Sequence, residues 1–134
     1  MRILLSKKFD KSNKNIIFDT NVVNTVSKKI INIKGKFDTG ATDCYIKEAH
    51  AKDLGLYAIG STIVTTANSS VHCKQYIADL EIEGEIFKDV IIIGLPNPGT
   101  DFLIGMDIIM QGKTVIEPAK DSYFVTFERG LNLF

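Results

Sequence analysis

A carboxylate followed by a hydroxyl residue and a glycine is the feature of this sequence best suited to chemistry. Phe37-Asp38-Thr39-Gly40 follows a run of apolar and β-branched residues that indicates a strand. Gly40 has no Cβ, so a second backbone or a substrate can approach closely there, and Thr39 can hydrogen-bond backbone groups and stiffen a turn. A carboxylate in that position is well placed at the floor of a cleft. Because Asp, Thr and Gly are also common at surface turns, the tripeptide alone does not decide between these interpretations.

The elements that must hold this loop are predicted to be mainly short strands. From Tyr76 to Glu83, apolar residues alternate with acidic ones, which is typical of a strand with one buried and one wet face. Ile86–Ile93 is more uniformly apolar, and Glu83-Gly84-Glu85 between the two segments indicates a hairpin. In the first strand we expect Ala78, Leu80 and Ile82 on one side and Asp79, Glu81 and Glu83 on the other. Further strands are predicted at positions 22–26, 29–37, 63–66, 71 onward and 123–127.

Helices are predicted in only two short segments. Lys47–Leu54 is followed by Gly55 as a C-cap, and Asp107–Gln111 is followed by Gly112 as a stop. A second hairpin is expected around Asn68, because asparagine tolerates the positive φ of a tight turn. The predicted fold class is therefore mainly β, a small closed or nearly closed barrel with one or two short helices.

Composition limits the classes of protein to which the chain can belong. Its 134 residues, 45% of them hydrophobic, predict one domain covering residues 1–134. The formal net charge of zero argues against a nucleic-acid partner. Val90–Leu95, the longest apolar stretch, is too short to span a membrane, so we expect a soluble, cytoplasmic protein. Cys44 and Cys73 fit two reduced thiols better than a disulfide or a zinc site.

The order and spacing of several motifs resemble those of the retropepsin-like aspartic proteases, and more closely the bacterial and cellular members than the retroviral ones. That family's catalytic loop is an apolar residue, Asp, Thr or Ser, Gly, and Ala or Ser, as in Phe37–Ala41. Phe102–Asp107 resembles the second motif, two apolar residues and a glycine before a short helix. Thr65–Asn68 resembles the flap hairpin that closes over a bound peptide, and Ala49–Leu56 the helix after the loop. The resemblance spans residues 31–111.

The resemblance implies the acid-protease (retropepsin) fold and an aspartic endopeptidase that needs no cofactor, with Asp38 as general acid or base. Such hydrolysis uses two carboxylates that share one proton. The sequence contains one full Asp-Thr-Gly, so a homodimer must supply the second carboxylate at a two-fold axis. The expected partners are a second copy and a peptide or protein substrate. The catalytic loop would be Asp38, Thr39 and Gly40, and the substrate contacts Ala41, Thr42, Asp43, Thr66, Ala67, Asn68, Ser69 and Ile104.

Several positions depart from the family pattern or allow a second interpretation. The flap has no glycine near its tip, where many relatives have one, and Ser69 and Ser70 stand there instead. Ala41 carries no hydroxyl to donate to the ionised carboxylate, so we expect optimum activity at mildly acidic pH. Asp43 suits a helix-entry cap as well as a specificity pocket. Thr42 and Met106 stand where retroviral members place an ion pair, which counts against a retroviral origin.

Two other functions compete with proteolysis by Asp38. The first is a catalytically silent module that keeps the barrel and binds peptides or acts as a scaffold; the glycine-free flap favours it. The second is a hydrolase with Cys44 as nucleophile and His50 or His72 as base, although no nucleophile-elbow sequence is present.

The two ends of the chain allow more than one interpretation. Residues 1–21 are an extension that the resemblance does not cover, and Phe18–Asn21 repeats Asp-Thr without the glycine and is interpreted as an ordinary turn. Lys7–Asn15 fits either a removable pro-segment or a solvated loop. Tyr123–Phe127 or Ile3–Leu5 is expected either in an intersubunit sheet or as an ordinary edge strand of one barrel.

Overall fold

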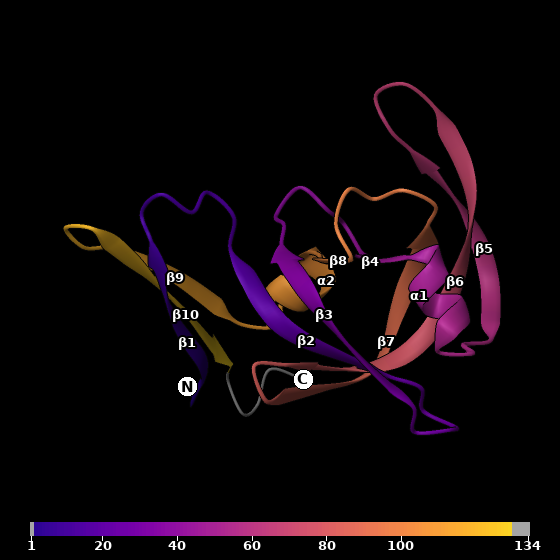
Figure 1. Cartoon of the computed structure of the whole chain (residues 1–134), viewed down its shortest axis with the longest axis horizontal. Helices are drawn as coiled ribbons and strands as arrows, with labels where there is room; N and C mark the ends of the chain where they lie inside the picture. The colour runs from indigo at the N-terminus through magenta and orange to yellow at the C-terminus, as the bar shows by residue number, and fades with distance from the viewer. Residues whose placement is uncertain (1, 130–134) are drawn as a thin grey trace.

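The computed structural model describes residues 2–129, which form two β-sheets and two short helices (Figure 1). The helices are α1 (Glu48–Asp53) and α2 (Met106–Ile109). The strands are β1 (Arg2–Asp10), β2 (Ile17–Val23), β3 (Ile30–Phe37), β4 (Cys44–Lys47), β5 (Ala58–Thr65), β6 (Ser70–Ile82), β7 (Glu85–Leu95), β8 (Phe102–Ile104), β9 (Lys113–Pro118) and β10 (Ser122–Arg129). The mainly β class predicted from the sequence is confirmed.

The larger sheet closes into a barrel. Its strand order is β2-β3-β8-β4-β7-β6, and an additional β2–β6 pairing joins the two ends, while β5 extends the sheet beyond β6. Closure pairs the edge strands with each other instead of leaving them open. The closed barrel expected from the pattern of short strands is therefore present.

The barrel interior is filled by aromatic and aliphatic side chains from all six of its strands. Burial of a side chain of this size contributes roughly 1.5–3 kcal/mol, so this core is the main source of stability. Its fully buried members include Phe18, Val22, Phe102, Ile104, Ile46, Ile92, Leu80 and Ile82, and β3 adds Ile33.

Strand β6 shows both the strength and the limit of the alternation rule. Ala78, Leu80 and Ile82 are buried as predicted. Asp79 is only 7% exposed, so its prediction as a wet-face residue is wrong. Here β7 carries one extra residue opposite β6, and the Asp79 carboxylate accepts hydrogen bonds from the Asp89 N–H (2.9 Å) and the Lys88 ammonium (3.0 Å). The buried carboxylate thus satisfies the unpaired backbone of a β-bulge.

The predicted β6–β7 hairpin is confirmed, with a two-residue turn at Glu83-Gly84. Ile82 pairs with Glu85, and the two turn residues have φ values of 47° and 89°. Two positive φ values are the signature of a type I′ turn, whose twist suits a hairpin.

The interpretation of Phe18–Asn21 as a turn is wrong. These residues lie in the middle of β2, where Phe18 pairs with Gly35 and Thr20 with Ile33. Phe18 and Thr20 are fully buried, while the intervening Asp19 is exposed. The period of two, rather than the turn propensity of Asp and Asn, identifies this segment.

The predicted strand over positions 22–26 also needs correction, because β2 ends at Val23. Asn24 then closes a turn, donating its backbone N–H to the Lys29 carbonyl (2.9 Å) and accepting the Val26 N–H on its side-chain oxygen (2.9 Å). An asparagine side chain that bonds the backbone two residues on competes with strand pairing.

The two ends of the chain form a separate three-stranded sheet in the order β1-β10-β9. Part of Lys7–Asn15 is therefore strand, because β1 continues to Asp10. Leu5 pairs with Phe127, so the two segments proposed for the dimer sheet pair with each other inside one chain. The sheet packs on the barrel through buried Leu5, Phe9, Val125 and Phe127, and the Phe127 ring lies 6.3 Å from Phe37.

Both predicted helices are present, with small changes of boundary. Helix α1 is one residue shorter at each end than expected, and Gly55 follows it with φ of 66°. Helix α2 begins at Met106, one residue early, and ends at Ile109. Neither helix in residues 2–129 is long and apolar enough to cross a membrane.

Candidate active site

The Asp38 loop follows β3 and is held by hydrogen bonds of its backbone, one of them to β8. The Asp38 N–H donates to the Ile104 carbonyl (3.0 Å), which continues the β3–β8 pairing beyond Phe37. The Asp38 carboxylate accepts the Gly40 N–H (2.9 Å), and the Ala41 N–H donates to the Asp38 carbonyl (3.2 Å). The carboxyl group is half-buried at the head of a tight turn, and it accepts no other hydrogen bond from residues 2–129.

The second motif packs directly against this loop. A Cβ on Gly105 would overlap the Asp43 carbonyl group and lie 3.0 Å from the Ala41 carbonyl oxygen. The next residue, Met106, donates its N–H to that same Ala41 oxygen (2.8 Å). Only glycine permits this approach, so the glycine of the second motif is a packing requirement of the Asp38 loop.

The remaining predicted loop residues have different exposures. Thr39, Gly40 and Thr42 are exposed, and Asp43 is half-buried. The Ala41 side chain is buried, with 8% of its surface exposed. The two faces of the loop are therefore distinct: Ala41 faces the protein, and the Thr39-Gly40 segment is available to a second molecule.

Ile104 does not present its side chain to a cleft. It is fully buried in the barrel core and serves the loop through its carbonyl oxygen. Successive strand residues point to opposite faces, so Leu103, which is half-buried, points the other way. Leu103 pairs with Tyr45 on β4, also half-buried. These two residues were missed from the sequence, although the alternation of β8 could have identified Leu103.

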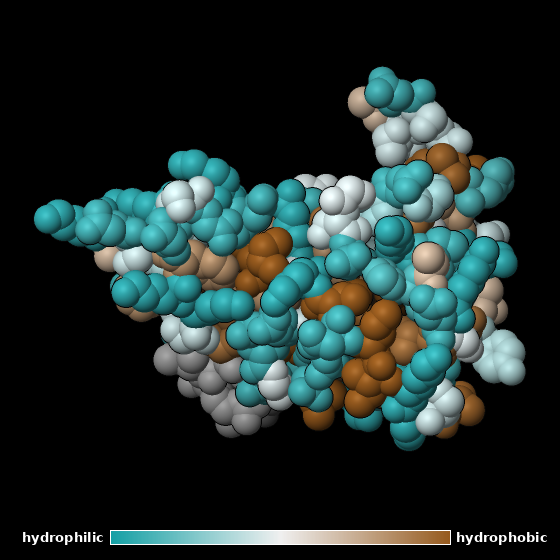
Figure 2. Space-filling model, viewed as in Figure 1, coloured by the Kyte–Doolittle hydropathy of each residue, from teal (hydrophilic) through white to brown (hydrophobic). Residues whose placement is uncertain are grey.

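The segment predicted as a flap is the tip of the β5–β6 hairpin. The Thr66 N–H donates to the Ser69 carbonyl (2.8 Å), and the Thr66 hydroxyl lies 3.3 Å from the same oxygen. All four residues from Thr66 to Ser69 are exposed. The hairpin projects from the barrel on the side where the β3–β4 loop also rises (Figure 1), and its tip carries hydrophilic side chains (Figure 2).

The thiol and histidine groups do not form a nucleophile–base pair. Cys44 is fully buried, and its thiol donates to an Asp107 carboxylate oxygen (3.2 Å). Burial and then the Asp107 charge raise the pKa of Cys44 well above its usual range. The His50 ring instead contacts the Asp101 carboxylate (2.9 Å), and His72 is exposed on β6. A protonated, buried thiol is a poor nucleophile.

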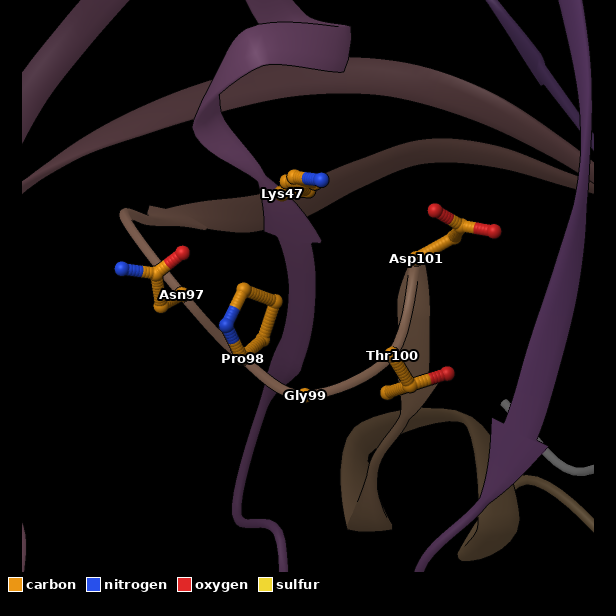
Figure 3. A pocket seen from close by; sticks show the side chains of 6 residues that line it. All are labelled: Lys47, Asn97, Pro98, Gly99, Thr100 and Asp101. Atoms are coloured by element: carbon orange, nitrogen blue, oxygen red, sulfur yellow. The ribbon is translucent and has the colours of Figure 1, made fainter.

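A pocket of about 470 Å³ lies between the end of β4 and the β7–β8 loop (Figure 3). No motif in the sequence indicated it, because its two walls are far apart along the chain. Within residues 2–129, no group of three or more His, Cys, Asp or Glu side chains could hold a metal ion. The pocket is lined by Lys47, Asn97, Pro98, Gly99, Thr100 and Asp101.

The closed barrel with an Asp-Thr-Gly loop braced by β8 and by the glycine that follows it defines the retropepsin-like class of aspartic proteases. Residues 26–111 match the family described as "gag-polyprotein putative aspartyl protease". That range is more than half of the chain, and the chain belongs to this family. No curated protein sequence matches it at a significant level.

Solved structures with the same fold come from a bacterium and from retroviruses. The crystal structure of a retropepsin-like aspartic protease from Rickettsia conorii has a TM-score of 0.61 at 23% identity, covering 92% of this chain and 91% of that one. The EIAV protease bound to an inhibitor gives 0.54 at 17% identity, over 75% and 89% of the two chains. The simian foamy virus protease gives 0.51 at 15% identity, over 71% and 92%. At these identities the likeness shows a common fold.

Proposed function

We propose that the protein is an aspartic endopeptidase in which the Asp38 carboxylates of two identical chains activate one water molecule. The observation that carries the proposal is the construction of the Asp38 loop. Its backbone is bonded to Ile104 and packed on Gly105, and within the described residues its carboxylate accepts a single hydrogen bond, from the Gly40 N–H. Membership of an aspartyl protease family supports the same conclusion.

Each of the two carboxylates would have its own part in the reaction. The ionised one takes a proton from the attacking water, and the protonated one donates to the scissile carbonyl oxygen. Two carboxylates in contact cannot both ionise, so they share a proton and their pKa values separate. The chemistry uses only the two side chains and water.

A homodimer follows from the count of suitable aspartates. The chain has one Asp-Thr-Gly, and the Asp-Thr pair at Asp19 lies in the middle of β2 with its carboxylate bonded to the Lys34 ammonium (2.6 Å). The second catalytic carboxylate would therefore be Asp38 of another copy. An isologous dimer places equivalent residues across its two-fold axis.

The other predicted residues would bind the loop or the peptide. Thr39 would brace the two loops across the axis, and Gly40 would offer its carbonyl group to the substrate backbone. The exposed tip Thr66–Ser69 would cover the peptide, which binds as an added strand. Thr42 and Asp43, with the half-buried Leu103, would line side-chain pockets.

A catalytically silent peptide-binding module is the second candidate, and one observation favours it. The flap tip contains no glycine and is closed by the Thr66 to Ser69 hydrogen bonds. A stiffer tip would open less readily to admit and release peptides. Such a module would bind peptides through the same surfaces and leave them uncut.

Asp38→Asn, compared with Asp19→Asn, separates the two functions. For a protease, Asp38→Asn should lower the cleavage of fluorescently labelled casein by about 10²–10⁴-fold without changing the melting temperature. Asp19→Asn alters the other Asp-Thr pair and should leave the cleavage rate intact. Specific activity of the wild type should also fall on dilution below the dimer dissociation constant. Equal activity in Asp38→Asn and wild type would refute the protease proposal, and peptide binding without cleavage by the wild type would favour the module.

A further inference from the structure

The pocket between β4 and the β7–β8 loop contains one cation and one carboxylate, and the structure separates them. Lys47 donates its backbone N–H to the Asp101 carbonyl oxygen (3.1 Å), so the two residues are neighbours. No ion pair joins their side chains, however, because the Asp101 carboxylate is bonded to the His50 ring (2.9 Å). The exposed Lys47 ammonium has no carboxylate partner anywhere in residues 2–129.

The rest of the lining adds uncharged polar groups around this cation. Asn97 offers a side-chain amide and Thr100 a hydroxyl, and neither side chain has a hydrogen-bond partner within the part of the chain that is described. In Figure 3 the ammonium end of Lys47 is directed across the pocket toward the side of Asp101. Ammonium, amide and hydroxyl groups together can donate several hydrogen bonds to one carboxylate.

We propose that this pocket is a specificity subsite that binds an acidic side chain of the peptide substrate through the Lys47 ammonium. The inference rests on the proposed peptidase function and names the substrate class: peptides with Asp or Glu at a fixed position. His50 is a positioning residue, because its hydrogen bond holds the Asp101 carboxylate away from Lys47 and keeps the cation free.

The distance to Asp38 sets the position of the acidic residue in the substrate. Asp101 directly precedes β8, and the carbonyl of Ile104 at the end of β8 holds the Asp38 N–H. Three strand residues at a rise of about 3.3 Å each span about 10 Å. An acidic side chain bound in this pocket would therefore lie about 10 Å from the cleaved bond.

Peptide binding to the subsite can be measured without cleavage in the Asp38→Asn variant. A library of random peptides, C-terminally amidated so that only side chains carry carboxylates, is captured on this protein and sequenced. The expected result is enrichment of Asp and Glu at one position. Glu and Gln versions of a captured peptide should then differ in affinity by about fivefold, the upper range for an exposed ion pair. Adding Lys47→Gln should reduce that ratio to about one.

Two further variants test whether the Glu preference comes from the Lys47 ammonium itself or from the overall charge of the protein. Lys52→Gln removes an exposed lysine of α1 that does not line this pocket, and it should keep the Glu preference. His50→Ala should release Asp101 to pair with Lys47 and lower the preference, whereas His50→Gln retains a donor and should restore most of it. An unchanged Glu to Gln ratio in the Lys47→Gln protein overturns the inference.

Cleavage of the same Glu and Gln peptides by the protein with its native Asp38 tests the protease function and the subsite separately. If the peptides bind with a Lys47-dependent Glu preference and are not cut, the subsite stands and the protease function fails. If they are cut at equal rates, with equal affinity, the protease function stands and the subsite fails.

Discussion

The chain contains the pair Asp-Thr after a phenylalanine twice, and the two copies have different structures. In Phe37-Asp38-Thr39 the strand ends and the backbone turns, whereas Phe18-Asp19-Thr20 continues through the middle of β2. Thr39 is exposed, but Thr20 is fully buried and donates its hydroxyl to the Phe18 carbonyl (3.1 Å). Residue types alone therefore do not make a catalytic loop.

The difference lies in what each segment packs against. Each is approached by a glycine of another segment: Gly105, just after β8, at the Asp38 loop, and Gly35, in the neighbouring strand β3, at Thr20. At Gly105 the nearest atoms are backbone atoms of Asp43, and at Gly35 the nearest atom is the Thr20 hydroxyl oxygen. The Asp38 loop is thus fixed by contact between two backbones, and β2 at Thr20 by contact between backbone and side chain.

The largest effect is expected for Gly105→Ala. The new Cβ would overlap the Asp43 carbonyl group, which no rotamer change can move. Overpacking against backbone should lower the free energy of unfolding by about 3 kcal/mol and displace Asp38, with loss of cleavage. Chemical denaturation and the casein assay measure the two effects. A fully active, equally stable variant would show that the loop does not depend on this contact.

Gly35→Ala is the matched comparison and should be milder, about 1–2 kcal/mol. Combining it with Thr20→Ala should recover part of that stability, because the clash is with a side-chain oxygen. No side-chain truncation should rescue Gly105→Ala. Equal rescue at both sites would contradict the distinction between the two glycine contacts.

Ala41→Ser should shift the activity profile without a large change in stability. A serine hydroxyl could donate to the ionised form of the carboxylate pair and stabilise it. The acidic limb of the pH–rate profile should then move to lower pH relative to the mildly acidic optimum of the wild type. Ala41→Gly adds no donor and is the control. Identical profiles for serine and alanine would remove this explanation of the optimum.

The smallest effect concerns Asp19, the aspartate of the other Asp-Thr pair. The hydrogen bond and charge of Lys34 lower the pKa of Asp19 in the folded protein. A lowered folded pKa stabilises the fold above the ordinary aspartate value and ceases to do so as pH falls through the lowered value. Lys34→Met should therefore melt at a slightly lower temperature than wild type at neutral pH, and the difference should close as the pH falls below the lowered pKa of Asp19. Because both groups are exposed, added salt should also shrink it.

Local pattern predicted much of the fold and the end of a strand just before Asp38. Alternation identified the buried side of β6, and Gly84 and Gly55 indicated a hairpin turn and a helix end. The local sequence pattern gave the wrong prediction where a contact between distant segments determined whether a side chain is buried. Asp79 is buried because a bulge in β7 supplies its partners, and Leu103 rather than Ile104 reaches the surface of β8.

The sequence by itself determined that the chain carries one Asp-Thr-Gly, which can be counted without coordinates, and the proposed two-carboxylate site rests on that count. It also determined the periodicities that make the barrel strands. Only the tertiary structure decided that Gly105 packs on the Asp43 backbone. It also decided that the Asp101 carboxylate bonds to His50 and not to Lys47. A periodic pattern records which face of a strand is buried, whereas such contacts depend on the register between segments that are distant in the chain.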